Sequence, residues 1–358
     1  MYEPVWAMGM MSGTSLDGVD AALLRTDGEK IYEFGPSLTL PYEPEFQEEL
    51  RLALNQSGDI PAAARDLTVR HAEAAMNLLH KANMKARDIK VIGFHGQTVA
   101  HRPNHGITWQ IGDAALLASM TGMDVVFDFR SMDVAQGGQG APLVPLYHAA
   151  ISKEMPKPIV ILNIGGISNV TWIDKDGVKK WIQAFDTGPG NGLIDEMTLR
   201  RTGNAYDEGG KLALQGKVDE TALKGYMYDT FFEMPPPKTL DRYDFGVEPV
   251  MHLSTNDALA TLVEFTVESV VRAQDYFYRT PQRWLVTGGG RHNAAIMKRL
   301  KERLGDVRRI DDAGLDGDAL EAQAFAFLAI RSLRHLPLTL PEITGARRPV
   351  SGGAFYQA

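Results

Sequence analysis

The chain has 358 residues, of which 44% are hydrophobic and 23% charged, a composition typical of globular rather than disordered proteins. Its formal net charge of −8 argues against nucleic acid or an anionic membrane as a partner, because either would need a basic face. The sequence contains no cysteine, which excludes disulfides, thiolate nucleophiles and thiolate metal sites and is in line with a reducing cytoplasm. We find neither an apolar run of bilayer length nor a leader pattern, so we expect a cytoplasmic protein that is not embedded in a membrane.

The first part of the chain predicts a three-stranded meander followed by alternating helices and strands. Apolar runs bounded by turn residues predict the strands, and apolar residues at helical spacing predict the helices. The predicted strands are 5–12, 19–24, 31–40, 89–94 and 125–129, and the predicted helices are 45–55, 60–82 and 113–121.

The second part repeats this order of elements without repeating the sequence. The predicted strands are 159–163, 168–173, 180–185, 284–287 and 307–310, and the predicted helices are 191–202, 255–277, 293–304 and 319–333. A duplicated order of this kind predicts an α/β protein with two similar βββαβαβα lobes and a central active-site cleft. We predict a first lobe of residues 1–128 plus 321–358 and a second lobe of residues 129–320.

The turn between the first two strands is rich in glycine and hydroxyl side chains. Gly13, Thr14, Ser15 and Gly18 provide unhindered backbone N–H groups and two hydroxyls, which suit a phosphate. Asp17 or Asp20 would face an accompanying cation, and the sequence does not choose between them. An ordinary hairpin turn favours the same residue types, so the turn alone leaves both interpretations open.

Three further glycine-rich turns occur in the second half, at 163–168 (NIGGIS), 185–192 (FDTGPGNG) and 287–290 (TGGG). The last two join a strand to a helix, where the backbone N–H groups attract anions. Two segments lie outside the duplicated plan. Residues 133–145 predict a loop, and residues 233–250 predict an irregular insertion that covers substrate or is packed by its own aromatic residues.

Six motifs together resemble one known family. GTSLDGVD (13–20), FHGQT (94–98), GGQGAPLVP (137–145), LNIGGISN (162–169), DTGPGN (186–191) and TGGGRHN (287–293) are similar to the motifs of the anhydro-N-acetylmuramic acid kinases and occur in that family's order. That family is part of the actin, Hsp70 and hexokinase superfamily, which has a ribonuclease H-like fold. The resemblance implies an ATP- and Mg²⁺-dependent homodimer that opens 1,6-anhydro-N-acetylmuramic acid with water and phosphorylates O6 in peptidoglycan recycling.

The resemblance also implies roles for individual residues. Asp186 corresponds to the catalytic aspartate that activates the water, although an aspartate here also suits the cap of the following helix. The phosphates and nucleotide would be bound by Gly13, Thr14, Ser15, Leu16, Asp17, Gly18, Val19, Asp20, Gly165, Gly166, Gly188, Gly288, Gly289 and Gly290. The sugar and its lactyl carboxylate would be bound by His95, Gln97, Thr98, Arg130 and Glu321. For Glu321, a first-turn acid favoured by the helix dipole explains the residue equally well.

Two other functions are compatible with the same fold. A general sugar kinase or an acetate-kinase-like enzyme would share the phosphate loops but would not need a water-activating base. An actin-like ATPase without a transferase activity would leave the FHGQT and GGQGAPLVP motifs unexplained.

Overall fold

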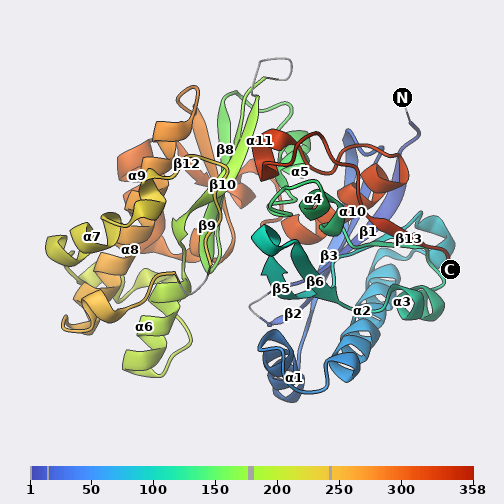
Figure 1. The fold of residues 1–358 in the computed structure, drawn as a ribbon, viewed down its shortest axis with the longest axis horizontal. Coiled ribbons are helices and arrows are strands. Elements are labelled where there is room, and N and C mark those ends of the chain that lie inside the picture. Colours follow the sequence, from blue (N-terminus) through green and yellow to red (C-terminus); the bar gives the residue numbers. More distant parts are fainter. Residues whose placement is uncertain (1, 14–15, 176–180, 242–243) are drawn as a thin grey trace. The chain divides into compact units, whose positions relative to one another are not determined.

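The computed structural model describes residues 2–13, 16–175, 181–241 and 244–358. The chain forms two compact units (Figure 1): unit 1 comprises Met1–Lys153 and Ala319–Ala358, and unit 2 comprises Glu154–Asp318. The sequence predicted lobe boundaries after 128 and 320, whereas residues 129–153 and 319–320 belong to unit 1. Hydrogen bonds explain why residues 129–153 belong to unit 1: Asp133 accepts one from Thr344, and Tyr147 donates one to Gln323.

Unit 1 is built on a six-stranded sheet with the order β13-β7-β4-β1-β2-β3. The first three strands form the predicted antiparallel meander, and β4 and β7 continue the sheet parallel to β1. The strands are β1 (Val5–Ser12), β2 (Gly18–Thr26), β3 (Ile31–Pro41), β4 (Ile92–Phe94), β7 (Val125–Phe127) and β13 (Ala354–Tyr356).

Helices cover both faces of this sheet. The helices of unit 1 are α1 (Pro44–Leu54), α2 (Ile60–Ala82), α3 (Ala114–Thr121), α4 (Ser131–Ala135), α5 (Pro145–Ile151), α10 (Leu320–Leu333) and α11 (Pro341–Thr344). Helix α2 has the predicted bounds, because Asp59 caps its first turn and Asn83 ends it in a left-handed conformation. Met8 and Met10 of β1 pack in the same core cluster as Leu67 and Leu78 of α2.

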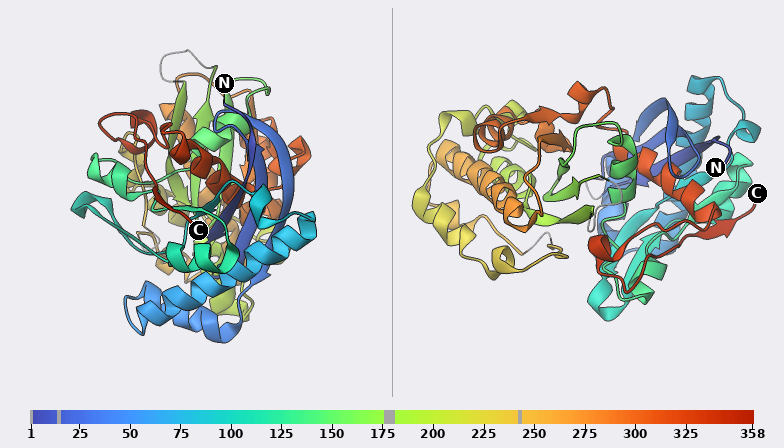
Figure 2. Two further views of the ribbon diagram at one scale, coloured as in Figure 1. Left: turned by 90° about the vertical axis from the view of Figure 1, so that its right-hand side faces the viewer. Right: turned by 90° about the horizontal axis from the view of Figure 1, so that it is seen from above.

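Helix α10 lies against β1 and β4, on the face of the sheet opposite to α2. One strand can contact both helices, because successive side chains of a strand point to opposite faces. Figure 2 shows this orange-red helix beside the blue strands of unit 1. Glycine makes the close approach feasible, since a Cβ atom on Gly93 would lie 2.1 Å from the carbonyl oxygen of Phe325. Gly9 meets the carbonyl of Ala322 in the same way. Helix α10, although far from the N-terminus in sequence, is thus an integral layer of unit 1.

Unit 2 repeats the plan with a five-stranded sheet of order β10-β9-β8-β11-β12. Strands β8, β9 and β10 form the second meander, and β11 pairs parallel with β8 and β12. The elements are β8 (Ile159–Ile164), β9 (Ile167–Ile173), β10 (Ile182–Pro189), β11 (Arg283–Thr287), β12 (Val307–Arg309), α6 (Gly192–Thr202), α7 (Glu220–Met227), α8 (Thr255–Arg272) and α9 (Ala294–Leu304). This confirms the predicted duplicated α/β plan.

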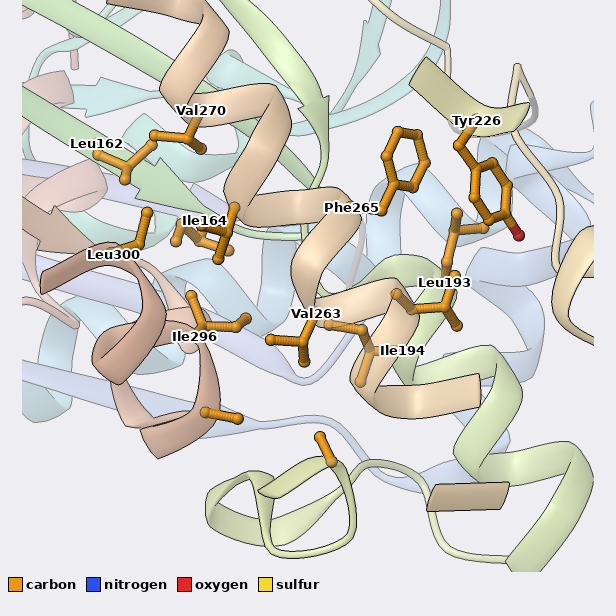
Figure 3. Close-up of a cluster of buried hydrophobic side chains, with 14 of the residues drawn as sticks. Leu162, Ile164, Leu193, Ile194, Tyr226, Val263, Phe265, Val270, Ile296 and Leu300 are labelled. Atoms are coloured by element: carbon orange, nitrogen blue, oxygen red, sulfur yellow. The ribbon is translucent and has the colours of Figure 1, made fainter. Parts of the chain in front are cut away.

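The core of unit 2 lies between its sheet and helices α6, α8 and α9. Figure 3 shows how side chains from these elements meet: Leu162, Ile164, Leu193, Ile194, Val263, Val270, Ile296 and Leu300. Beside them the rings of Tyr226 and Phe265 stack with centroids 4.4 Å apart. Burial of this apolar surface stabilises the sheet edge from which the candidate site residues project.

Three features differ from the sequence prediction. The FHGQT motif continues into an unpredicted two-stranded sheet, β5 (Gln97–Arg102) and β6 (Ile107–Ile111). The predicted loop at 133–145 overlaps two helices: α4 extends over its first residues to Ala135, and α5 begins at its last residue, Pro145. Strand β10 does not end near residue 185 but continues to Pro189 through an irregularity between Asp186 and Gly188. Among the described residues, no helix has both the length and the apolar character needed to cross a membrane.

Candidate functional site

The turn between β1 and β2 is held by buried polar side chains. The amide of Gln97 donates to Ser12 Oγ at 2.7 Å and to the carbonyl oxygens of Ser12 and Gly13 at 3.2 Å, in the orientation that satisfies its neighbours. The hydroxyl of Tyr42 donates to the same Ser12 Oγ at 2.8 Å. Gln97 and Ser12 are almost fully buried. The Gln97 amide therefore orders the turn, and it would contact a ligand only by giving up these bonds.

The remaining residues of this turn are placed as follows. Thr14 and Ser15 lie outside the described residues. Leu16 adopts φ = 58°, and its N–H donates to the carbonyl of Gly13, so the backbone turns sharply here. The N–H of Tyr42 bonds to the carbonyl of Asp17 at 3.0 Å, which ties the turn to the end of β3.

Asp17 and Asp20 have different surroundings. Asp17 is exposed, whereas Asp20 is partly buried on β2 and accepts a hydrogen bond of 2.5 Å from Thr39. Val19, by contrast, is fully buried in the core. Among the described residues, no three His, Asp or Glu side chains are grouped as a metal-binding set. Mg²⁺ at phosphate-transfer sites commonly uses one or two carboxylates together with substrate phosphates, and Asp17 and Asp20 are the carboxylates near this turn.

A second polar cluster in unit 1 contains His95, Arg130 and Glu321. Arg130 donates to His95 Nε2 at 2.9 Å and to the carbonyl of Gly140 at 2.8 Å. His95 Nδ1 lies 2.8 Å from the carbonyl of Gly96, so the proton is on Nδ1 and Nε2 accepts. Burial and the adjacent guanidinium lower the pKa of His95 well below its usual value, so the ring is neutral at pH 7.

Arg130 is the charged centre of this cluster. Burial lowers the pKa of Arg130 to about 10, and the negative charges of Glu321 and Asp133 oppose the shift. The guanidinium therefore stays charged at neutral pH. Its Nε atom is buried and has no hydrogen-bond partner among the described residues. The fork predicted to bind a carboxylate is turned toward Gly140 and His95 in this structure.

Asp133 supports this cluster and was not singled out in the sequence. Its carboxylate is buried and accepts hydrogen bonds from the N–H of Gly140 at 2.7 Å and from the hydroxyl of Thr344 at 2.7 Å. Gly140 in turn accepts from Arg130, so Asp133 orders the acceptor that orients the guanidinium. Only the tertiary fold brings residues 133 and 344 together. Thr98 lies further along β5, where its hydroxyl accepts from Gln110 at 3.2 Å.

In unit 2, three glycine-rich turns lie side by side. The N–H groups of Gly190 and Asn191 donate to the carbonyls of Gly166 and Gly165 at 2.9 and 2.7 Å. These amides are satisfied within the protein, which corrects the expectation that they are free for an anion. Gly192 donates to Gly166 as well, at 3.1 Å. Gly188 is buried against Ser269 of α8.

The third turn, Gly288–Gly290, is held against the end of β8. A Cβ atom on Gly288 would lie 2.4 Å from Asn163 Oδ1, and Gly289 projects to the surface. Arg291 follows the turn and donates to the carbonyl of Gly288 at 3.0 Å. Its buried guanidinium also pairs with Asp311 and Asp318 at 3.0 and 2.7 Å, so it anchors this turn. Arg291 belongs to the TGGGRHN motif, but its role was not apparent from the sequence.

Asp186 lies on β10, at the edge of the sheet and next to the register shift. Its carboxylate accepts a hydrogen bond of 2.9 Å from the N–H of Leu240, and its own N–H donates to the carbonyl of Lys238 at 3.1 Å. Burial raises the pKa of Asp186 to about 7, and the bond from Leu240 opposes the rise. A carboxylate that titrates near neutral pH is suited to general-base catalysis. The insertion at 233–250 therefore supplies one partner for the carboxylate, Leu240, and one for the backbone N–H of Asp186, Lys238.

The similar proteins of known name are kinases. The chain is 51% identical to anhydro-N-acetylmuramic acid kinase of Rhodospirillum rubrum, over 99% of this chain and 95% of that protein. It is 49% identical to the Paramagnetospirillum magneticum enzyme of that name, over 98% and 99%, and 47% identical to that of Gluconobacter oxydans, again over 98% and 99%.

The sequence profile of the anhydro-N-acetylmuramic acid kinase family matches residues 5–358, and the chain belongs to this family. This confirms the resemblance carried by the six motifs. Similarity to solved structures is more remote. Component A of (R)-2-hydroxyglutaryl-CoA dehydratase from Acidaminococcus fermentans aligns with a TM-score of 0.46 and 12% identity over 91% of this chain and 99% of that one, too distant to carry an argument.

Proposed function

We propose that this chain uses ATP and Mg²⁺ to open 1,6-anhydro-N-acetylmuramic acid with water and to phosphorylate O6. The products would be N-acetylmuramic acid 6-phosphate and ADP. Family membership supports the reaction, and the environment of Asp186 supports the mechanism. The observation that carries the proposal is a half-buried carboxylate with a pKa of about 7, held in place by the N–H of Leu240.

Asp186 would act as the general base. Its carboxylate takes a proton from water as the water oxygen bonds to C1 of the sugar and the C1–O6 bond breaks. O6 leaves with the bonding electron pair and attacks the γ-phosphorus of ATP, whose bond to the bridging oxygen of ADP then breaks. The proton held by Asp186 is released to solvent after the products leave. Each bond that forms is thereby matched by one that breaks.

The phosphates of ATP would be bound by the turn of unit 1 from Gly13 to Asp20 and by the glycine turns at 165–166 and 288–290 of unit 2. Phosphoryl transfer depends mainly on positioning and charge neutralisation, which backbone N–H groups provide. Asp17 or Asp20 would hold Mg²⁺, which neutralises phosphate charge when bound. Gly188 would act indirectly, because it is buried behind the turn.

The sugar would be bound by the polar residues of unit 1. His95 and Thr98 offer neutral hydrogen-bonding groups, and Arg130 offers a charge that attracts the lactyl carboxylate. Gln97 would contribute by ordering the β1–β2 turn. Glu321, at the start of α10, would accept a hydrogen bond from a sugar hydroxyl or from the water.

The direct test is an assay of the purified chain with anhydro-N-acetylmuramic acid, ATP and Mg²⁺, followed for ADP and a sugar phosphate. Run in ¹⁸O-labelled water, the reaction should place one label at C1 of the product. A sugar phosphate without label would favour a general sugar kinase mechanism. ATP hydrolysis without a sugar phosphate would favour an ATPase without transferase activity. Either result would overturn the proposal.

We also propose a homodimer, on the basis of the family resemblance. Light scattering of the purified chain should give twice the mass of 39.4 kDa. A monomer at micromolar concentration would contradict this part of the proposal and leave the proposed chemistry unaffected.

A further inference from the structure

Lys238 is a buried cation close to the proposed base, and neither the family resemblance nor the proposed chemistry accounts for it. Its side chain is only 5% exposed. The ammonium group donates to the carbonyl of Phe231 at 3.0 Å, and it lies 4.5 Å from the ring centre of Phe231 and 4.8 Å from that of Tyr276. The ring of Phe185 is 6.0 Å away. We call these three rings the aromatic clasp.

Within the described part of the chain, no carboxylate is among the groups whose charge acts on the ammonium group of Lys238. Burial, assisted by the positive charge of Arg272, lowers the pKa of Lys238 to about 8. Ring faces and one carbonyl therefore replace the water that a lysine normally keeps. Burying an unpaired charge is costly, and a methionine of similar length would fill the same space without that cost.

The backbone beside this lysine is bonded to Asp186. The carbonyl of Lys238 accepts from the N–H of Asp186 at 3.1 Å, and two residues later the N–H of Leu240 donates to the Asp186 carboxylate at 2.9 Å. Residues 238–240 thus lie along the outer edge of β10, where no further strand pairs in the described sheet. Residues 238–240 belong to no helix or strand of their own. The nearest elements along the chain are one-turn helices at 230–233 and 248–250.

The aromatic clasp links this segment to three separate elements. Phe185 precedes Asp186 on β10, Phe231 lies in the turn Thr230–Glu233, and Tyr276 follows α8. The hydroxyl of Tyr276 donates to the carbonyl of Phe232 at 2.9 Å, which joins two of these elements directly. A single ammonium group at their meeting point fixes the position of the backbone that carries it. The cation is attracted to every ring face, whereas an apolar side chain would allow the segment to slide.

We propose that Lys238 is a positioning residue for the reaction: its ammonium group, held in the aromatic clasp, keeps the Leu240 amide in place to orient the carboxylate of Asp186. This inference rests on the proposed function, because it assigns to Lys238 an effect on the base. The contacts of the Lys238 ammonium group are the Phe231 carbonyl and the aromatic clasp, so its effect on Asp186 would pass through the backbone. Its removal should therefore affect the chemical step more than substrate binding.

The test is Lys238→Met, which keeps the length of the side chain but removes its charge and donor. We expect kcat to fall about 10- to 100-fold, with KM for the sugar and for ATP changed by less than about threefold. Lys211→Met is the matched control, since Lys211 is an exposed lysine of the same unit that pairs with Glu208. That control should keep the kcat of the unaltered enzyme. Lys238→Arg, which keeps the charge, should recover most of the loss.

A double-mutant cycle separates positioning from general damage to the fold. If Lys238 acts through Asp186, Lys238→Met should cause no further loss of kcat when Asp186 is already asparagine. An equal loss in both backgrounds, or an unchanged kcat in the single variant, would overturn the inference. If Lys238→Met does not fold, Tyr276→Leu replaces it in the same cycle with the same expectations. Failure of the unaltered enzyme to phosphorylate the sugar would instead overturn the proposed function.

Discussion

The β1–β2 turn of unit 1 and the β8–β9 turn of unit 2 occupy the same place in their meanders but are held in different ways. In the first, the side chains of Tyr42 and Gln97 bond to Ser12, in addition to the backbone bond from the Tyr42 N–H to Asp17. In the second, most of the bonds come from backbone, because the N–H groups of Gly190 and Asn191 donate to its carbonyls, and one side-chain bond runs from the Asn191 amide to the carbonyl of Ile164. A turn held by side chains depends on particular residue types, whereas one held by backbone depends on the absence of a Cβ atom.

The same three-stranded meander places an acidic residue differently in the two units. In unit 1, the side-chain bonds leave an exposed acidic residue, Asp17, at the turn. In unit 2, the backbone bonds bring the glycine turns together, while Asp186 is placed by a separate segment. The acidic residue of unit 1 thus lies at the turn itself, whereas the acidic residue of unit 2 is held by the N–H of Leu240, outside the glycine turns. Four variants test this difference between the two units.

Asp186→Asn should have the largest effect, because it removes the proposed base and preserves the shape of the side chain. We expect kcat to fall roughly 100- to 10,000-fold, the usual range for a general base. The Kd of a non-hydrolysable ATP analogue, measured by calorimetry, should change less than about twofold. A variant that keeps the original kcat would remove Asp186 from this role.

Gly190→Ala tests the turn held by backbone. The added Cβ atom would lie 2.2 Å from the carbonyl oxygen of Gly165, so the turn must open. We expect a loss of stability of about 1–3 kcal/mol, measured by thermal unfolding. Gly166→Ala is the control, because a Cβ atom there would meet nothing within 4 Å. Equal melting temperatures for the two variants would show that the backbone contact does not hold the turn.

Leu240→Pro removes the N–H that donates to Asp186 and should alter the pH dependence. The base works when deprotonated, so activity should fall as the pH drops below the Asp186 pKa of about 7. Loss of a hydrogen bond to the carboxylate raises that pKa, which should move the acid limb of kcat upward by about 1 pH unit. Leu240→Ala keeps the N–H and should leave the limb in place. Superimposable profiles for all three proteins would refute the assignment.

Tyr42→Phe tests the turn held by side chains and should have the smallest effect. It removes one buried hydrogen bond to Ser12, which should cost about 1 kcal/mol in thermal unfolding. We also expect KM for ATP to rise about two- to fivefold while kcat stays nearly constant. Tyr228→Phe, at a side chain that is 91% exposed, is the control. A fall in kcat at constant KM would contradict the distinction between the two turns.

Local sequence patterns determined most of the secondary structure and the duplicated plan. Apolar runs bounded by turn residues fixed the two meanders, and Asp59 and Asn83 marked the ends of α2 because caps act over one helical turn. The glycine-rich turns were visible for the same reason, since tight turns need glycine at particular positions. Asp186 was found through its match to the family's DTGPGN motif, because the end of its strand was predicted four residues too early. Six motifs in order were sufficient to identify the family.

Which distant residues hold these motifs in place depends on the tertiary structure. Asp133 and Thr344, Ser12 and Gln97, and Lys238 and Phe185 are far apart in sequence and meet through packing, which no local pattern encodes. The elevated pKa of Asp186 has the same origin, because burial depends on everything that surrounds the carboxylate. Short-range sterics and hydrogen bonding thus determine where helices and strands form, and burial by residues distant in sequence determines the pKa of Asp186.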